Sequence, residues 1–142
     1  MPDTSAAVQR LFDAMNAHDL DAVAAAAAEN VEFVDVATGE EIHNRAEWRQ
    51  YCGRYLKAFP DMHLEQTNLV AEGDQAFVEA VAHGTNDGPL ESPDGEIPPT
   101  GKTIAVKFSM VFRVRDGQIA DSREYYDGMT LMTQLGLVPP PA

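Results

Sequence analysis

The clearest candidates for chemistry lie near the C-terminal end, in the segment Arg123-Glu124-Tyr125-Tyr126-Asp127. Asp127 follows two tyrosines at the end of a predicted strand over residues 118–126. A strand end can hold a carboxylate at the mouth of a pocket, where apolar walls raise its pKa toward neutrality. We therefore predict that Asp127 is a catalytic general acid or base. The alternative is that it caps a short helix over residues 131–135.

The turn Asp116-Gly117 predicts which side chains share a face with Asp127. A two-residue turn of this type pairs Arg115 with Gln118 and fixes the register of both strands. The face that carries the aromatic and methionine side chains is predicted to point inward. A bulge near Arg123 would invert part of this assignment. The predicted pairs on the inner face are Phe112 with Asp121, Met110 with Arg123, Phe108 with Tyr125 and Val106 with Asp127.

Two neighbours of Asp127 are further catalytic candidates. Tyr125 can donate a hydrogen bond to a developing enolate, although aromatic residues in strands usually serve packing. Arg123 can hold Asp127 or Asp121 in place, or bind an anionic group of a substrate, although an arginine on a strand is more often part of a surface ion pair. Tyr126 is the weaker candidate of the two tyrosines.

A second group of residues is predicted to bind the substrate. Asp35 follows a short strand over residues 31–36, where it can alternatively form a turn. Trp48, Tyr51 and Tyr55 lie on one apolar helical stripe, which most often is core. His83 lies opposite His63 if Gly73 centres their hairpin; with no third ligand evident, a metal site is not expected. The complete prediction is Asp35, Trp48, Tyr51, Tyr55, His83, Phe108, Met110 and Phe112.

The order of elements indicates an α+β fold. Helices are predicted from Thr4 or Ser5, from Asp19 to about Glu29-Asn30, and from Asn44 to Phe59, with Glu47 at the spacing of a capping box. Strands follow over residues 64–70, 75–83, 103–115 and 118–126, and residues 85–100 form a long loop. Residues 86–100 of this loop are either a lid or a plain disordered segment. We expect one domain over residues 1–142, with three N-terminal helices on a curved, mainly antiparallel sheet around a cone-shaped pocket.

Composition excludes several classes of function. The chain has 23 acidic residues against 10 lysines and arginines, which gives a net charge of −13. This charge argues against partners such as nucleic acid or an anionic membrane. The single cysteine, Cys52, allows neither an internal disulfide nor a thiolate zinc site. The N-terminal residues do not resemble a signal peptide, so we expect a cytoplasmic protein.

Several short motifs, in their order along the chain, resemble the SnoaL-like polyketide cyclases, which share a cone-shaped α+β fold with nuclear transport factor 2 and ketosteroid isomerase. Each motif is weak alone, whereas their order and spacing are specific for the family. The chain departs from many relatives at Asn86, where those carry histidine. The motifs are Ala58-Phe59-Pro60-Asp61, Ala71-Glu72-Gly73-Asp74, Gly84-Thr85, Ile97-Pro98-Pro99-Thr100-Gly101-Lys102, Phe112-Arg113-Val114 with Asp116-Gly117, and Tyr126-Asp127 with Gln134-Leu135-Gly136.

The resemblance implies a cofactor-independent enzyme that acts on an apolar cyclic or polyketide-like substrate. It gives Asp127 the role of acid/base in an aldol ring closure, and Asp35 the position of the proton-shuttling acid of ketosteroid isomerase. Met110 takes the place of the second acid of that isomerase. The resemblance also implies a homodimer and no metal or organic cofactor. Two alternatives stay open: a binding or dimerisation domain without catalysis, and an epoxide hydrolase built on Asp121, Arg123 and Asp127.

Overall fold

The structure is a computed structural model that describes residues 3–92 and 94–139. Four α-helices and eight β-strands follow in the order expected for an α+β fold. The helices are α1 (Thr4–Asn16), α2 (Leu20–Ala25), α3 (Arg45–Ala58) and α4 (Gly128–Gln134). The strands are β1 (Ala27–Asp35), β2 (Glu40–Ile42), β3 (His63–Glu72), β4 (Gln75–Thr85), β5 (Leu90–Ser92), β6 (Gly95–Ile97), β7 (Thr103–Arg115) and β8 (Gln118–Tyr126).

The helix ends follow the capping chemistry of the sequence with two corrections. Asn44 caps α3 through the Glu47 N–H, as predicted, and the Glu47 carboxylate accepts from the N–H of His43. Helix α1 is capped by Asp3, one residue before the predicted Thr4. Helix α2 ends at Ala25, earlier than predicted, because the remaining alanines enter strand β1 and Ala27 packs into the core with no exposed surface.

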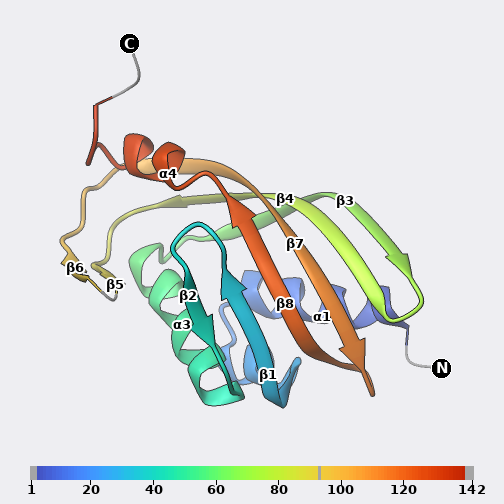
Figure 1. Cartoon of the computed structure of the whole chain (residues 1–142). Coiled ribbons are helices and arrows are strands. Elements are labelled where there is room, and N and C mark those ends of the chain that lie inside the picture. The colour runs from blue at the N-terminus through green and yellow to red at the C-terminus, as the bar shows by residue number, and fades with distance from the viewer. Residues whose placement is uncertain (1–2, 93, 140–142) are drawn as a thin grey trace.

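One six-stranded sheet forms the body of the molecule, in the order β2-β1-β8-β7-β4-β3 (Figure 1). All neighbouring strands are antiparallel except β1 and β8, which run parallel. The hairpin between β3 and β4 places His63 opposite His83, as predicted. The prediction of a curved, mainly antiparallel sheet with helices packed on it is thereby confirmed. The additional helix α4 follows β8 and packs on β7.

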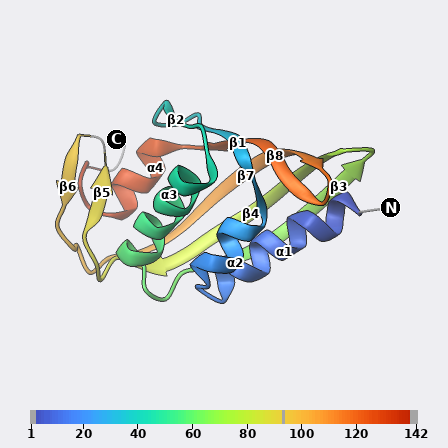
Figure 2. The same ribbon diagram turned by 90° about the horizontal axis from the view of Figure 1, so that it is seen from below.

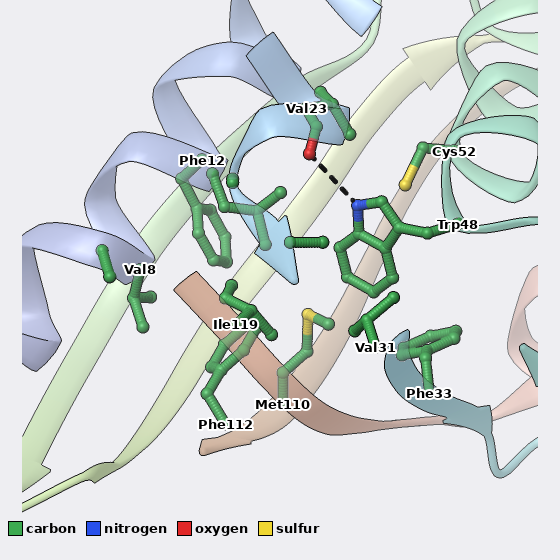
Figure 3. Packing of buried hydrophobic residues seen from close by; sticks show 14 of the residues in the cluster. Val8, Phe12, Val23, Val31, Phe33, Trp48, Cys52, Met110, Phe112 and Ile119 are labelled. Atoms are coloured by element: carbon green, nitrogen blue, oxygen red, sulfur yellow. Dashed lines mark hydrogen bonds between the residues drawn. The ribbon is translucent and has the colours of Figure 1, made fainter. Parts of the chain in front are cut away.

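Helices α1, α2 and α3 lie on the same side of the sheet (Figure 2), and the main core fills the space between them and the strands. Trp48 of α3 is 2% exposed and donates its indole N–H to the carbonyl oxygen of Val23, 3.3 Å away (Figure 3). The ring of Phe33 packs edge-on against Trp48. These contacts tie α3 to α2 and β1, and so fix one wall of the space that α3 shares with the sheet.

The segment predicted as a long loop contains the small hairpin of β5 and β6, which is not part of the main sheet. Its two ends are held together by Asn86, which is fully buried. The Asn86 amide donates to the carbonyls of Ala58 and Gly88 and accepts from the backbone and hydroxyl of Thr100. All four hydrogen-bonding positions of this amide are used. Asn86, which stands where many relatives carry histidine, therefore has a structural role.

Candidate functional site

An apolar cavity opens between the helices and the inner face of the sheet. It has a volume of about 110 Å³, several times the roughly 10–15 Å³ that one water molecule needs by the same measure. Nineteen residues line it, of which eight are aromatic. Glu124 is the one charged residue among these lining residues, all of which belong to the described part of the chain. Its carboxyl therefore stands out as the group that can do acid/base chemistry in the cavity.

A β-bulge in β8 decides which acid reaches the cavity. Arg115 pairs with Gln118 and Val114 with Ile119, as the turn predicts, but Arg113 pairs with Asp121. Ala120 is thus an extra residue that the partner strand does not match. Because side chains alternate between the two faces of a strand, one extra residue reverses the faces of everything beyond it.

The bulge makes the predicted inner face of β8 wrong beyond Ile119. Phe112 pairs with Ser122, Met110 with Glu124 and Phe108 with Tyr126, each one residue later than predicted. Ser122 is 2% exposed, and both Glu124 and Tyr126 line the cavity. The side chains that replace the predicted Asp121, Arg123 and Tyr125 are therefore Ser122, Glu124 and Tyr126.

Parallel pairing of β1 with β8 places a second carboxyl beside Glu124. Asp35 pairs with Glu124 across the two strands and is fully buried. Its Oδ2 accepts hydrogen bonds from Tyr51 Oη at 2.7 Å and Tyr126 Oη at 3.1 Å. Its Oδ1 accepts from the N–H of Thr38 at 3.1 Å. Asp35 is thus an anchored carboxylate with three donors rather than a free base.

Burial and the nearby Asp35 charge raise the pKa of Glu124 to about 8. Desolvation makes the larger contribution to this pKa shift, because the apolar walls disfavour the ionised carboxylate. Repulsion from Asp35 adds a smaller contribution. A carboxyl with this pKa is mostly protonated at neutral pH but ionises readily. Such a group can both release and take up a proton under ordinary conditions.

The tyrosines around the two carboxyls stay protonated. Burial, followed by repulsion from Asp35, raises the pKa of Tyr55 to about 12. Burial also raises the pKa values of Tyr51 and Tyr126, again with contributions from the carboxyl groups. All three line the cavity, but Tyr51 and Tyr126 donate their hydroxyl protons to Asp35, so Tyr55 is the one of the three that can donate to a bound molecule.

Asp127 lies outside the cavity, contrary to the prediction. It is the N-cap of α4, where its Oδ1 accepts from the N–H of Met129 at 3.0 Å and its Oδ2 from the hydroxyl of Thr130 at 2.9 Å. These hydrogen bonds lower the pKa of Asp127, which is exposed to solvent. The predicted alternative, a helix cap, describes its structural position.

Arg123 and Tyr125 lie on the outer face of the sheet, because the bulge turns them away from the helices. Arg123 donates to the hydroxyl of Tyr125 at 3.3 Å, and Tyr125 is 43% exposed. Asp121 also faces outward and lies 3.5 Å from the guanidinium of Arg113. The arrangement of Asp121, Arg123 and Asp127 around one water, which an epoxide hydrolase would need, is therefore not formed.

The predicted substrate-binding residues divide into three groups. Five line the cavity: Trp48, Tyr51, Tyr55, Phe108 and Met110. Asp35 lies directly behind the cavity wall, where it binds the hydroxyls of Tyr51 and Tyr126. Phe112 is buried in the main core instead, and His83 points to the outer face, 3.0 Å from a carboxylate oxygen of Glu65. Within residues 3–92 and 94–139, no three potential ligands cluster as a metal site would need.

Sequence reasoning missed Glu124, although the sequence carries a signal for it. In the uninterrupted register, two aspartates and an arginine face the core, and unpaired buried charges are unfavourable by several kcal/mol. Moving the register by one residue places Asp121 and Arg123 in solvent and leaves Glu124 as the single inward charge beyond the bulge. The charge pattern of β8 therefore indicates a bulge before Asp121.

The fold is shared with many known structures. One is a proposed SnoaL-like polyketide cyclase from Jannaschia sp. CCS1, which is 24% identical with a TM-score of 0.83 over 96% of this chain and 93% of the other. IdmH, a proposed polyketide cyclase from Streptomyces antibioticus, is 27% identical with a TM-score of 0.78 over 94% and 99% of the two chains. A proposed ketosteroid isomerase from Kribbella flavida is 22% identical with a TM-score of 0.67 over 98% and 83%.

Among curated proteins, none matches the sequence significantly. No helix within the described residues has the length and apolar character needed to cross a membrane. The sequence profile of the SnoaL-like domain matches residues 8–122, which is most of the chain. The match runs from Val8 within α1 to Ser122 within β8, and it includes all of α3 and the Asp116-Gly117 turn. The chain belongs to the SnoaL-like domain family.

Proposed function

We propose that this protein is a small cofactor-independent enzyme of the cyclase or isomerase type, in which Glu124 transfers the proton. The observation that supports this proposal is a carboxyl with a pKa near 8 in the wall of an apolar cavity. Glu124 takes the role that the sequence suggested for Asp127. The SnoaL-like fold, shared with proposed polyketide cyclases and a proposed ketosteroid isomerase, supports the same class of reaction.

The reaction begins on an apolar cyclic or polyketide-like ketone bound in the cavity. The ionised form of Glu124 removes a proton from the carbon next to the carbonyl group. Tyr55 is the candidate donor to the enolate oxygen, because its hydroxyl belongs to the tyrosine cluster but has no hydrogen bond to Asp35 among the described residues. In a ring closure the enolate then attacks a second carbonyl carbon, whose oxygen becomes an alkoxide and takes the proton back from Glu124. In an isomerisation the enolate instead regains the proton from Glu124 at another carbon.

Asp35 has a supporting role in this proposal. Its bonds to Tyr51 and Tyr126 hold both rings in place, and its charge disfavours ionisation of Glu124. Because the base is the ionised carboxylate, the rate is expected to rise about tenfold per pH unit up to about pH 8 and then to level off.

Hydrogen–deuterium exchange at carbon tests the proposal without knowledge of the natural substrate. Cyclic ketones, beginning with 2-tetralone, are incubated with the protein in heavy water, and loss of the C–H signals is followed by NMR. We expect Glu124→Gln to lower the exchange rate by at least about 100-fold, as for loss of a general base. Asp127→Asn, a matched carboxyl-to-amide change outside the cavity, is expected to stay within a few-fold of wild type.

Either of two results would contradict the proposal. One is exchange that persists within a few-fold in Glu124→Gln. The other is a wild-type protein that accelerates exchange of no ketone in the panel but binds some of them. The second result would favour the alternative function, a small-molecule-binding domain without catalysis, for which the enclosed apolar cavity would be sufficient.

We also propose a homodimer, as the resemblance suggested. The outer face of the main sheet is not covered by helices α1–α3 (Figures 1 and 2), and it carries the exposed side chains of Val70, Phe77 and Tyr125. Light scattering is expected to give twice the chain mass of 15.5 kDa. A monomer at micromolar concentration would contradict this proposal.

A further inference from the structure

We propose that the cavity selects its ligand by charge, and that it takes an apolar molecule with a weakly hydrated ammonium group, such as a quaternary or N-methylated amine, placed against the Glu124 carboxyl and the aromatic walls. This inference rests on the site of the proposed function. Its test measures binding and proton release instead of turnover, so that either proposal can fail without the other.

The cavity wall provides two features that recognise such a cation, aromatic rings and a carboxyl group. Eight of the 19 lining residues are aromatic, and the faces of aromatic rings attract cations. Six of these aromatic residues come from β1, α3, β7 and β8, the elements that also surround Glu124: Phe33, Trp48, Tyr51, Tyr55, Phe108 and Tyr126. No lysine, arginine or histidine is among the lining residues within the described chain, so an incoming cation meets no like charge in the wall.

Glu124, the one charged residue among the described lining residues, has no partner for its carboxyl. Among the described residues, no hydrogen bond or ion pair to its carboxyl is formed, whereas the neighbouring Asp35 accepts three hydrogen bonds. The hydrogen bonds of the protein thus go to Asp35, whereas the Glu124 carboxyl lines the cavity without one. The Glu124 side chain is half-buried in the cavity wall, and a cationic ligand would supply the partner that its carboxyl lacks.

Glu124 is surrounded by groups from its own strand and from three neighbouring elements. Asp35 faces it from β1 and Tyr126 from its own strand, while Tyr51, Cys52 and Tyr55 face it from α3. Strand β7 contributes the uncharged Met110. The cation Arg54 lies 5.3 Å from the centre of the Tyr51 ring and is paired with Glu40. Burial raises the pKa values of the Cys52 thiol and of the three tyrosines, so these groups stay uncharged at the pH, about 8, at which Glu124 changes charge.

Weak hydration is needed because both ions lose water on binding. A compact primary ammonium is strongly hydrated, and its desolvation can exceed what a buried ion pair returns. A quaternary ammonium is less strongly hydrated and presents methyl groups that pack on aromatic rings. An anionic ligand would instead lie next to two carboxyl groups and is expected to be excluded.

Binding of a quaternary ammonium is coupled to a proton. The ligand has no proton to lose, and Glu124 is mostly protonated at pH 7. Pairing of the two therefore requires Glu124 to release its proton to the buffer. The affinity is expected to fall by about tenfold per pH unit below pH 8, because the carboxyl must ionise before it can pair with the cation.

The probes are benzyltrimethylammonium and its uncharged isostere neopentylbenzene, which replaces the nitrogen by carbon. Affinities are measured through the fluorescence of Trp48, the single tryptophan, which lines the cavity. Proton release is measured by calorimetry of the cation in two buffers with different heats of ionisation. For wild type at pH 7 we expect the cation to bind at least about tenfold tighter than the isostere, with close to one proton released.

Two carboxyl-to-amide variants complete the experiment. Glu124→Gln is expected to abolish both the proton release and the preference for the cation, while Asp127→Asn keeps both. The proposal would be overturned by a cation that binds no tighter than the isostere, by binding without proton release, or by proton release that persists in Glu124→Gln. If Glu124→Gln does not fold, the pH dependence of wild-type affinity decides, and a flat profile between pH 6 and 8 would refute the proposal.

Discussion

Two carboxyl groups at the end of β8 lie three residues apart and have opposite surroundings. Glu124 lines an apolar cavity beside Asp35, and its pKa is raised to about 8. Asp127 is exposed at the start of α4, where two hydrogen bonds from the helix lower its pKa. Both are acids near paired tyrosines, so residue type alone does not separate them. The difference comes from the side of the sheet on which each carboxyl lies.

In this comparison, strand register decides on which face of the sheet a charged side chain lies, and neighbouring groups then shift its pKa. The extra residue Ala120 turns Glu124 inward and Arg123 outward. Desolvation and the charge of Asp35 then act on Glu124, whereas Asp127 meets helix N–H groups and water. The following four predictions test that division, in order of the expected effect.

Insertion of one alanine between Asp121 and Ser122 is expected to have the largest effect. With the bulge at Ala120 kept, the extra residue places Arg123 opposite Met110 and Tyr125 opposite Phe108, on the inner face, and turns Glu124 into solvent. Burial of unpaired Arg123 is unfavourable by several kcal/mol, so we expect loss of cooperative folding in thermal unfolding. Deletion of Ala120 is the matched control, because it removes the unmatched residue but keeps every pair from Asp121 onward, and it should still fold. An insertion variant with wild-type stability would show that this register does not set the faces of β8.

Removal of the anchored carboxylate is expected to have the next largest effect. Asp35→Ala leaves the hydroxyls of Tyr51 and Tyr126 and the N–H of Thr38 without their acceptor. We expect a loss of about 3 kcal/mol in free energy of unfolding, measured with urea at pH 7. Tyr51→Phe removes one donor and is expected to cost about 1 kcal/mol. If Asp35→Ala lost less than about 1 kcal/mol, the network would contribute little to stability.

Substitution of Glu124 is expected to change how stability depends on pH. The folded protein keeps the Glu124 proton up to about pH 8, whereas the unfolded chain loses it near the ordinary pKa of glutamate. Wild-type stability contributed by this group is therefore full at about pH 4 and declines as pH rises to 8. Glu124→Gln should remove this decline and be more stable by roughly 2–3 kcal/mol at pH 7. Parallel pH profiles of the two proteins would exclude a raised pKa at Glu124.

The smallest effect is expected at Asp127. Asparagine caps helices as well as aspartate, so Asp127→Asn should leave thermal unfolding at pH 7 almost unchanged. Asp127→Ala removes both hydrogen bonds and should increase amide hydrogen exchange in residues 129–135 without affecting the cavity. The Asp127 contribution is present above its unfolded pKa and is lost as pH falls. A destabilisation as large as that of Asp35→Ala would show that Asp127 has contacts beyond the cap.

Much of the fold could be predicted because its signals are local. Asn44 marks the start of α3, and the Trp48-Tyr51-Tyr55 stripe indicates the face that now lines the cavity. The Asp116-Gly117 turn gave the correct pairing for its first two residue pairs. The alanine-rich segment after Val23 was predicted as helix because alanine favours it, but pairing with β8 through Ala27 draws it into a strand. Tertiary pairing thus overrode local propensity there.

The sequence by itself determined that this is an acidic α+β chain of the SnoaL-like type, with a stripe of aromatic residues on one helix and further aromatic residues in the last hairpin. Only the tertiary structure decided which carboxyl enters the cavity. Strand side chains alternate with a period of two, so one unpaired residue at Ala120 exchanges Glu124 for Arg123 on the inner face. The position of that residue depends on contacts of β8 with both β7 and β1, which are far apart in the sequence, and no local pattern fixes contacts of that kind.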